Sequence, residues 1–128
     1  MSIKYIKSLD DDNYGQIECK DGEKTVGSLS YKICEHKRAW LYMIQVEESY
    51  RNQGIGTALL NIFEDVCADK WIRHIEGKYY PEGGNVRDFY EHRGYSIYKE
   101  GYATYVGKYY PKTQNLDGLN VVEGREKE

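Results

Sequence analysis

The chain has 128 residues, of which 18 are basic and 21 acidic, and its formal net charge at pH 7 is -3. This length allows one hydrophobic core and predicts a single domain over residues 1–110, followed by a polar tail over residues 111–128. Because charges of both signs are interspersed, the chain lacks the basic stripe that direct nucleic-acid binding requires. No apolar run approaches the ~18 residues that cross a bilayer, and the N-terminus lacks a signal-peptide core, so we expect a cytoplasmic protein without membrane contact.

The three cysteines are Cys19, Cys34 and Cys67, and they lie far apart in the sequence without a Cys-x-x-Cys pair. An odd number of isolated cysteines indicates neither a disulfide framework nor a zinc site. We therefore expect no bound metal.

The first third of the chain predicts four strands, at residues 3–7, 16–20, 25–35 and 38–46. Asp21-Gly22 separates the second strand from the third and is a signal for a tight hairpin, because glycine accepts the positive φ of such turns. The fourth segment, RAWLYMIQV, is apolar on both of its faces. This pattern is typical of a central strand that is covered on both sides.

An amphipathic helix is predicted from Gly54 onward, because apolar residues recur there with helical spacing. These residues are Ile55, Ala58, Leu59, Ile62, Phe63 and Val66. A strand is expected at residues 71–79, and then a two-turn helix at residues 85–93 with Asn85 as N-cap and Gly94 as terminator. A hairpin of residues 95–99 and 102–109 completes the order β-β-β-β-α-β-α-β-β.

The sequence RNQGIG, from Arg51 to Gly56, joins the fourth strand to the amphipathic helix. The N–H groups from Gln53 to Thr57 belong to the first helical turn, where they have no partner within the helix and can bind phosphate. The two glycines let an anion approach the backbone closely, and Arg51 adds a positive charge. Taken alone, such a Gly-x-Gly corner is more often a steric turn than an anion site.

Two segments resemble motifs of the Gcn5-related N-acetyltransferase (GNAT) family. VEESYRNQGIGTALL resembles the family's coenzyme loop, which reads Gln/Arg-x-x-Gly-x-Gly/Ala after the fourth strand, and FYEHRGY resembles its second motif, Phe-Tyr-Glu-x-x-Gly-Phe/Tyr. The resemblance covers roughly residues 25–109 and implies an α+β fold with α/β/α-like layering. Its mixed, mostly antiparallel sheet would have six to seven strands, splayed between strands four and five, with helices packed on it.

The resemblance also implies acetyl-CoA as the acyl donor, with the pantetheine arm in the splay and the pyrophosphate at the glycine loop. The coenzyme-binding residues that it implies are Ile44, Val46, Arg51, Asn52, Gln53, Gly54, Ile55, Gly56, Thr57 and Asn85. Of these, Asn85 stands two residues later than the corresponding asparagine of the family. Where the family inserts two helices after the first strand, this chain has only residues 9–15, so we expect an open acceptor side.

Acetyl transfer needs a deprotonated amine, a stabilised oxyanion and a proton for the departing thiolate. The resemblance places Tyr90 beside the coenzyme sulfur, and we expect it to act as the general acid. Trp40 stands where some members of the family carry a catalytic carboxylate on strand four. Tyr42 and Glu76 are therefore the candidate groups on the acceptor side, and a water relay is an equal alternative as the base.

We expect transfer of an acetyl group from acetyl-CoA to a primary amine by direct attack in a ternary complex. The acceptor would be a protein lysine or N-terminus, or a small polyamine-like molecule, and the protein a monomer or homodimer. The main alternative is a regulatory module of the same fold that binds CoA and catalyses weakly. A weaker alternative is a Rossmann-like nucleotide binder, for which Glu76 lies at the distance of the ribose-binding acid but Leu59 replaces the third glycine.

Overall fold

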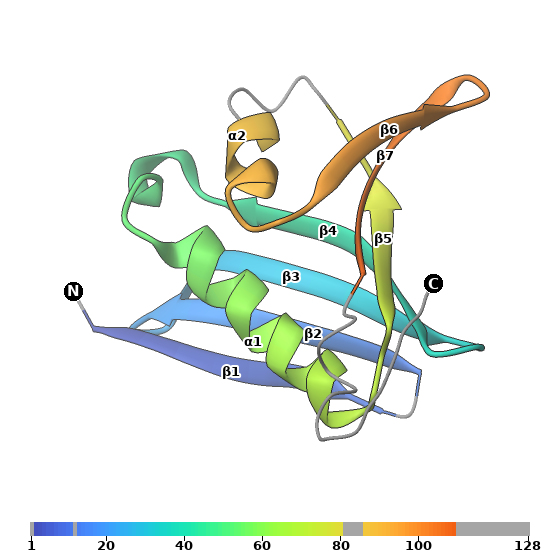
Figure 1. Ribbon diagram of the computed structural model, residues 1–128. Helices are drawn as coiled ribbons and strands as arrows, with labels where there is room; N and C mark the ends of the chain where they lie inside the picture. The colour runs from blue at the N-terminus through green and yellow to red at the C-terminus, as the bar shows by residue number, and fades with distance from the viewer. Residues whose placement is uncertain (1, 12, 81–85, 110–128) are drawn as a thin grey trace.

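The structure is a computed structural model, and it describes residues 2–11, 13–80 and 86–109. Figure 1 shows a sheet with helices against it. The strands are β1 (Ile3–Asp10), β2 (Tyr14–Asp21), β3 (Lys24–Cys34), β4 (Arg38–Val46), β5 (His74–Lys78), β6 (Ser96–Glu100) and β7 (Ala103–Tyr109). The helical segments are the 3-10 turn η1 (Glu48–Tyr50), α1 (Ile55–Asp69) and α2 (Val86–Glu91).

The seven strands form one sheet in the order β1-β2-β3-β4-β5-β7-β6. Strands β4 and β5 run parallel, with α1 as the crossover between them, and the other neighbouring pairs of the described sheet are antiparallel. The predicted mixed, mostly antiparallel sheet is therefore confirmed, at the upper end of the expected number of strands.

The parallel pairing of β4 with β5 is short. It runs from Arg38 opposite His74 to Leu41 opposite Gly77, whereas β4 stays paired with β3 as far as Val46. Beyond the last pair the two strands diverge, as Figure 1 shows. This confirms the predicted splay between the fourth and fifth strands.

The core lies between α1 and one face of strands β2, β3 and β4. The helix contributes the buried side chains of Ile55, Leu59, Leu60, Phe63, Val66 and Cys67. The strands contribute alternate residues, because successive side chains point to opposite faces of a sheet. Within this interface the rings of Tyr31 and Phe63 lie 5.0 Å apart.

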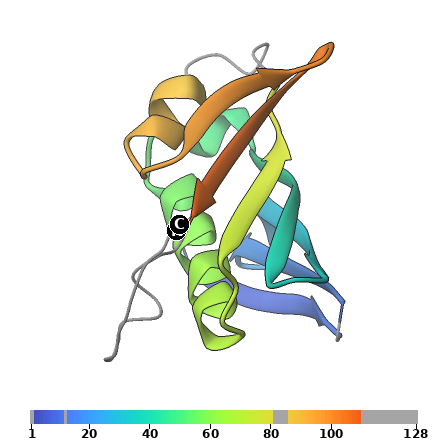
Figure 2. The same cartoon turned by 45° about the vertical axis from the view of Figure 1, so that its right-hand side comes forward.

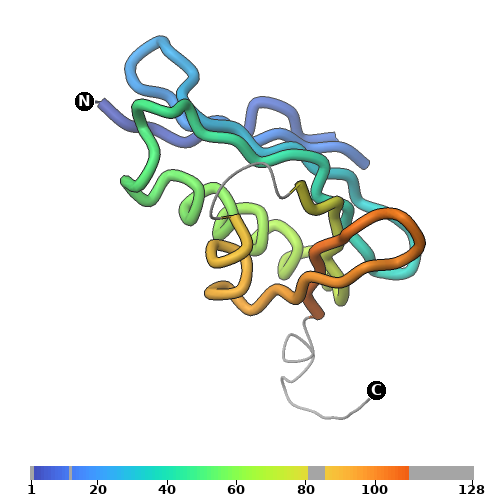
Figure 3. Tube along the Cα trace, turned by 90° about the horizontal axis from the view of Figure 1, so that it is seen from above, coloured from blue at the N-terminus to red at the C-terminus, as the bar shows by residue number. Residues whose placement is uncertain are grey.

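Both α1 and α2 lie on the same face of the sheet, as Figures 2 and 3 show. The two helices touch, since a Cβ added to Gly56 of α1 would lie 3.4 Å from the ring of Phe89 in α2. Among the described residues no helix covers the opposite face, so the layering is one of helices on a sheet. We call this opposite surface the open face.

The connection between β1 and β2 is short and adds no described helix to the open face. Asp10 ends one strand and Tyr14 begins the next. Between them the Asp11 carboxylate accepts hydrogen bonds from the backbone N–H groups of Asn13 at 2.9 Å and Tyr14 at 2.7 Å. This is a tight Asx turn.

Element boundaries differ from the prediction mainly at strand ends. β4 has the predicted bounds, β1 to β3 begin or end a few residues away from theirs, and β5 is shorter than predicted by three residues at its start. The 3-10 turn η1 was not predicted, and Asn85, the predicted N-cap, lies outside the described residues. No helix in the described ranges is both long and apolar enough to cross a membrane.

Candidate active site

The glycine loop forms a tight turn into α1. Asn52 and Gly54 have φ angles of 64° and 83°, and apart from Gly54 and its chain neighbours no described atom lies within 4 Å of the position that a Cβ on Gly54 would take. The helix has no side-chain N-cap, and the Ala58 N–H bonds the Gly54 carbonyl at 3.0 Å. The three preceding N–H groups thus have no partner within the helix, and they present a partial positive charge to the space above Gly54.

Two arginines lie near this turn. The Arg51 Nε donates to the Val46 carbonyl oxygen at 3.0 Å, which holds its exposed guanidinium against the end of β4. Arg93, which follows α2, donates to the Thr57 hydroxyl and, at 3.1 Å, to the Phe89 carbonyl oxygen. The sequence did not single out Arg93, because only the packing of α2 on α1 brings it to the start of the helix.

The Arg93 guanidinium also lies 4.6 Å above the Phe89 ring. Its Nε is buried and, within the described chain, has no hydrogen-bond partner. Burying a charged donor without a partner is costly, and a bound ion or an ordered water is one explanation for such a group. A positive charge is thereby held beside the N-terminus of α1.

Tyr90 is buried on α2, with 7% of its surface exposed. Its ring packs between those of Phe89 at 5.4 Å and Tyr95 at 5.6 Å. Burial, with a smaller contribution from the charge of Tyr79, raises the pKa of Tyr90 to about 12. Its phenol is therefore protonated at neutral pH and can donate a hydrogen bond.

Strand β4 carries a bulge at the point where it leaves β5. Its pairing with β3 passes from Leu41 directly to Met43, so Tyr42 is the extra residue and lacks a partner in the ladder. The Tyr42 side chain is 50% exposed. Beyond the bulge, the side chains of Ile44 and Val46 are half-buried and pack against the core.

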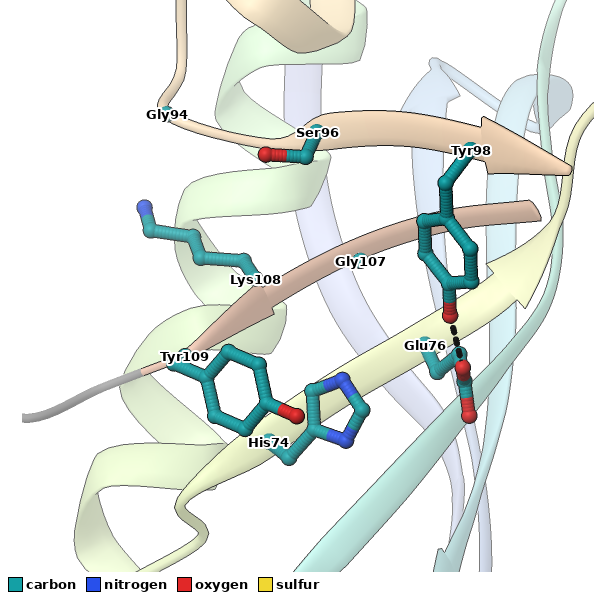
Figure 4. Close-up of a pocket in the computed structure, with 8 residues that line it drawn as sticks. All are labelled: His74, Glu76, Gly94, Ser96, Tyr98, Gly107, Lys108 and Tyr109. Atoms are coloured by element: carbon teal, nitrogen blue, oxygen red, sulfur yellow. Dashed lines mark hydrogen bonds between the residues drawn. The ribbon is translucent and has the colours of Figure 1, made fainter. Parts of the chain in front are cut away.

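Glu76 lies on the open face, because its neighbour Ile75 is buried against the helix side. Its carboxylate accepts a hydrogen bond from the Tyr98 hydroxyl, as Figure 4 shows. A cavity of about 360 Å³ lies beside it, lined in part by His74 and Tyr109, whose rings stack 4.1 Å apart. Burial lowers the pKa of His74, so its imidazole is neutral near pH 7.

The predicted site residues thus fall into two groups. Arg51 to Thr57 and Tyr90 lie on the helix side, around the start of α1, while Glu76 lies on the open face. The bulge at Tyr42 lies at the split between them, where β4 leaves β5. Two ligands could therefore reach the gap between β4 and β5 from opposite faces of the sheet.

Comparison with known proteins identifies the fold and the family. The model of the acetyltransferase (GNAT) family matches residues 2–95. Among curated protein sequences no significant match was found.

Three solved structures illustrate the structural similarity. The PaiA N-acetyltransferase from Thermoplasma acidophilum, in complex with coenzyme A, is 19% identical with a TM-score of 0.70, and the alignment covers 77% of this chain and 62% of that one. A protein from Bacillus anthracis in complex with acetyl coenzyme A is 18% identical with a TM-score of 0.70, covering 80% and 65%. The ribosomal-protein-alanine N-acetyltransferase from Escherichia coli is 18% identical with a TM-score of 0.66, covering 78% and 71%.

At these identities the similarity to the solved structures concerns the fold. The chain spans less than two thirds of the length of the first two. The family model, by contrast, matches most of the present sequence and includes the glycine loop and FYEHRGY. The chain belongs to the acetyltransferase (GNAT) family.

Proposed function

We propose that the protein binds acetyl-CoA and transfers its acetyl group to a primary amine by direct attack in a ternary complex. The observation that carries this proposal is the split of β4 from β5 after Leu41 and Gly77, directly before the uncapped start of α1. An extended arm can enter such a split, and an anion can bind at such a helix start. Two structural relatives have coenzyme A or acetyl coenzyme A bound.

The pyrophosphate of the coenzyme would lie above Gly54. The N–H groups from Gln53 to Thr57 would donate to it, with Asn52 shaping the turn through its positive φ. Arg51 and Arg93 would supply charge-assisted contacts, the second through a side chain that already lies against Thr57. The backbone of Ile44 and Val46 would bond the pantetheine arm, and Asn85 stays a candidate contact.

The chemistry would take place at the bulge of β4. The acceptor amine would attack the acetyl carbon, and a backbone N–H at the bulge, where Tyr42 has no partner residue on β3, would stabilise the oxyanion before the thiolate departs. Tyr90 would face the departing sulfur. Full transfer from a phenol of pKa about 12 to a thiolate of pKa about 8.5 is uphill by about 5 kcal/mol, so its main contribution is a hydrogen bond to the developing charge.

The acceptor would approach from the open face, where Tyr42 and Glu76 are its nearest predicted polar groups. Because no helix covers this face among the described residues, it would admit a protein amine as well as a small molecule. The Escherichia coli relative, whose name gives a protein acceptor, has the same fold with 18% identity. A water relay or Tyr42 would remove the proton of the amine.

Substitution Tyr90→Phe tests the role of Tyr90. We expect kcat to fall by about tenfold to a hundredfold, because a hydrogen bond to a charged group is lost in the transition state. The dissociation constant for acetyl-CoA, measured by calorimetry, should stay within about twofold. The matched control is Tyr102→Phe, which removes the same hydroxyl at a fully exposed position in the β6–β7 hairpin.

The outcomes separate the alternatives. Unchanged turnover in a folded Tyr90→Phe variant would remove Tyr90 from the mechanism. Tight binding of acetyl-CoA without thiol release in the presence of any amine would instead support the regulatory CoA-binding module. Failure to bind acetyl-CoA, or tighter binding of NAD, would refute the proposal itself.

A further inference from the structure

The cavity on the open face is built around Gly107 of β7. Figure 4 shows Tyr98 from β6 reaching across β7 to Glu76 on β5. A Cβ on Gly107 would lie 3.4 Å from both the Tyr98 ring and the His74 Nε2, so the missing side chain keeps the space open. The result is a cavity lined by one carboxylate, by the rings of Tyr98, His74 and Tyr109, and by Ser96 and Lys108.

Glu76 forms no salt bridge within the described residues, although Arg38, which is paired with His74 across β4 and β5, is close enough to add to burial, the larger cause, in lowering the pKa of His74. Glu76 is the one carboxylate among the residues that line the cavity, and within the described chain no Lys, Arg or His nitrogen lies within 4.0 Å of it. Its hydrogen-bond donor there is the neutral Tyr98 hydroxyl. Lys108 also lines the cavity, but its Nζ contacts the Arg93 carbonyl oxygen at 2.8 Å and the Glu64 carboxylate at 3.4 Å.

Aromatic side chains surround Glu76: Tyr98, His74 and Tyr109 line the cavity, and Tyr105 and Trp40 lie nearby without lining it. Tyr105 lies 5.8 Å from Tyr98 and 6.2 Å from Trp40, which is paired with Glu76 across β4 and β5. On the other side of Glu76 the neutral His74 ring stacks on Tyr109. A carboxylate next to aromatic rings favours an ammonium group and disfavours an anion.

We propose that this cavity binds a second ammonium group of the acceptor, one that is not acetylated, and that the preferred acceptor is a linear diamine. The inference rests on the proposed function and narrows its acceptor. Tyr42, at the bulge, lies two residues beyond Trp40 on β4, which corresponds to about 7 Å along the strand. A diamine that spans this distance reaches Glu76 with one nitrogen and the split with the other.

A monoamine of the same length has a single nitrogen, which can lie either at Glu76 or at the split between β4 and β5, but not at both. When it is held at Glu76 its amine is away from the split, so it occupies the site without reacting. It should therefore be a poor acceptor and a competitive inhibitor against the diamine.

The kinetic test compares cadaverine with n-pentylamine, using the full chain and acetyl-CoA. We expect kcat/KM for cadaverine to exceed that for n-pentylamine by about tenfold, which corresponds to about 1.4 kcal/mol. Glu76→Gln should remove this preference by raising KM for cadaverine, and Glu76→Asp, which keeps the charge, should retain part of it. Glu100→Gln, the same charge change at the exposed end of β6, should retain the preference in full.

Other results would overturn the inference. Equal kcat/KM values in the wild type, or a preference that survives Glu76→Gln, would exclude the cavity as an anchor. A fall in kcat for both amines with an altered pH profile would instead make Glu76 a general base.

Calorimetry without coenzyme separates this inference from the proposed function. Cadaverine should bind the free protein, and Glu76→Gln should weaken that binding by about tenfold. If acetyl transfer to monoamines occurs but cadaverine binding ignores Glu76, the inference fails and the proposed function stands. If cadaverine binds through Glu76 but acetyl-CoA does not bind, the proposed function fails. The cavity is then a cation site, but the inference that it anchors an acceptor of acetyl transfer fails as well.

Discussion

At the scale of single residues, glycines set the distances between strands and helices at the candidate site. Gly77 stands at the last pair before β4 and β5 separate, and a Cβ there would lie 2.6 Å from the Leu41 carbonyl oxygen. Neither backbone can yield without breaking the parallel pair. Gly56, in contrast, faces the Phe89 ring at an ordinary 3.4 Å.

Gly77→Ala should therefore lower the free energy of unfolding by about 1–3 kcal/mol, the cost of forcing an extra methyl group into a packed region. Gly56→Ala is the matched control and should change it by less than about 1 kcal/mol, because the added methyl meets a ring at contact distance and alanine favours the helix. Urea denaturation followed by circular dichroism measures both. Equal losses in the two variants would contradict the structure at Gly77.

At the scale of elements, the two helices end in the same Schellman motif with different residues. After α2, Gly94 has φ 86°, and the Tyr95 N–H bonds the Tyr90 carbonyl oxygen at 3.1 Å. After α1, Trp71 has φ 59°, and the Ile72 N–H bonds the Cys67 carbonyl oxygen at 2.9 Å. A left-handed backbone costs a side chain about 1–2 kcal/mol that glycine avoids.

Trp71→Gly should consequently be more stable than Trp71→Ala by about 1 kcal/mol. Both variants remove the same exposed indole, so the comparison isolates the backbone conformation. Thermal and urea denaturation of the two proteins provide the measurement. A Trp71→Ala variant as stable as Trp71→Gly would mean that residue 71 does not adopt the left-handed conformation.

Some elements could be predicted from the sequence and others could not. β4 and the start of α1 were predicted correctly, because the apolar run RAWLYMIQV and the glycine turn RNQGIG are both contiguous in sequence and a helical period follows the turn. β5 was predicted too long, since Trp71 to Arg73 has strand-like composition but belongs to the turn that ends α1. Local composition does not predict where the turn after a helix ends and the next strand begins.

At the scale of the whole molecule, the burial of thiols and phenols makes the free energy of unfolding depend on pH in the alkaline range. Burial, with a smaller contribution from Glu64, raises the pKa of Cys67 from 9.0 to about 12, and burial raises that of Tyr90 from 10.0 to about 12. At a pH between the unfolded and the folded pKa of each group, the unfolded chain has released a proton that the folded chain retains. The stabilisation is complete below the unfolded pKa and is lost as pH rises toward the folded pKa.

The free energy of unfolding should thus fall from about pH 9 upward, by about 1.4 kcal/mol per pH unit for each such group. Cys67→Ala should reduce the fall between pH 9 and pH 10, before the unfolded Tyr90 titrates. Urea denaturation at a series of pH values tests this. A decline as steep in Cys67→Ala as in the wild type would show that Cys67 does not carry the coupling.

The sequence by itself determined the family and the coenzyme-loop motif, because these depend on contiguous residues: a strand, a Gly-x-Gly turn, a helical period, and FYEHRGY. Only the tertiary structure decided the arrangement on the open face. Glu76, Tyr98 and Gly107 come from three strands whose spatial order, β5-β7-β6, differs from their order in the chain. The short β1–β2 connection could be read from the sequence, but the meeting of Glu76 with Tyr98 across Gly107 could not, because it depends on how three separate strands pair.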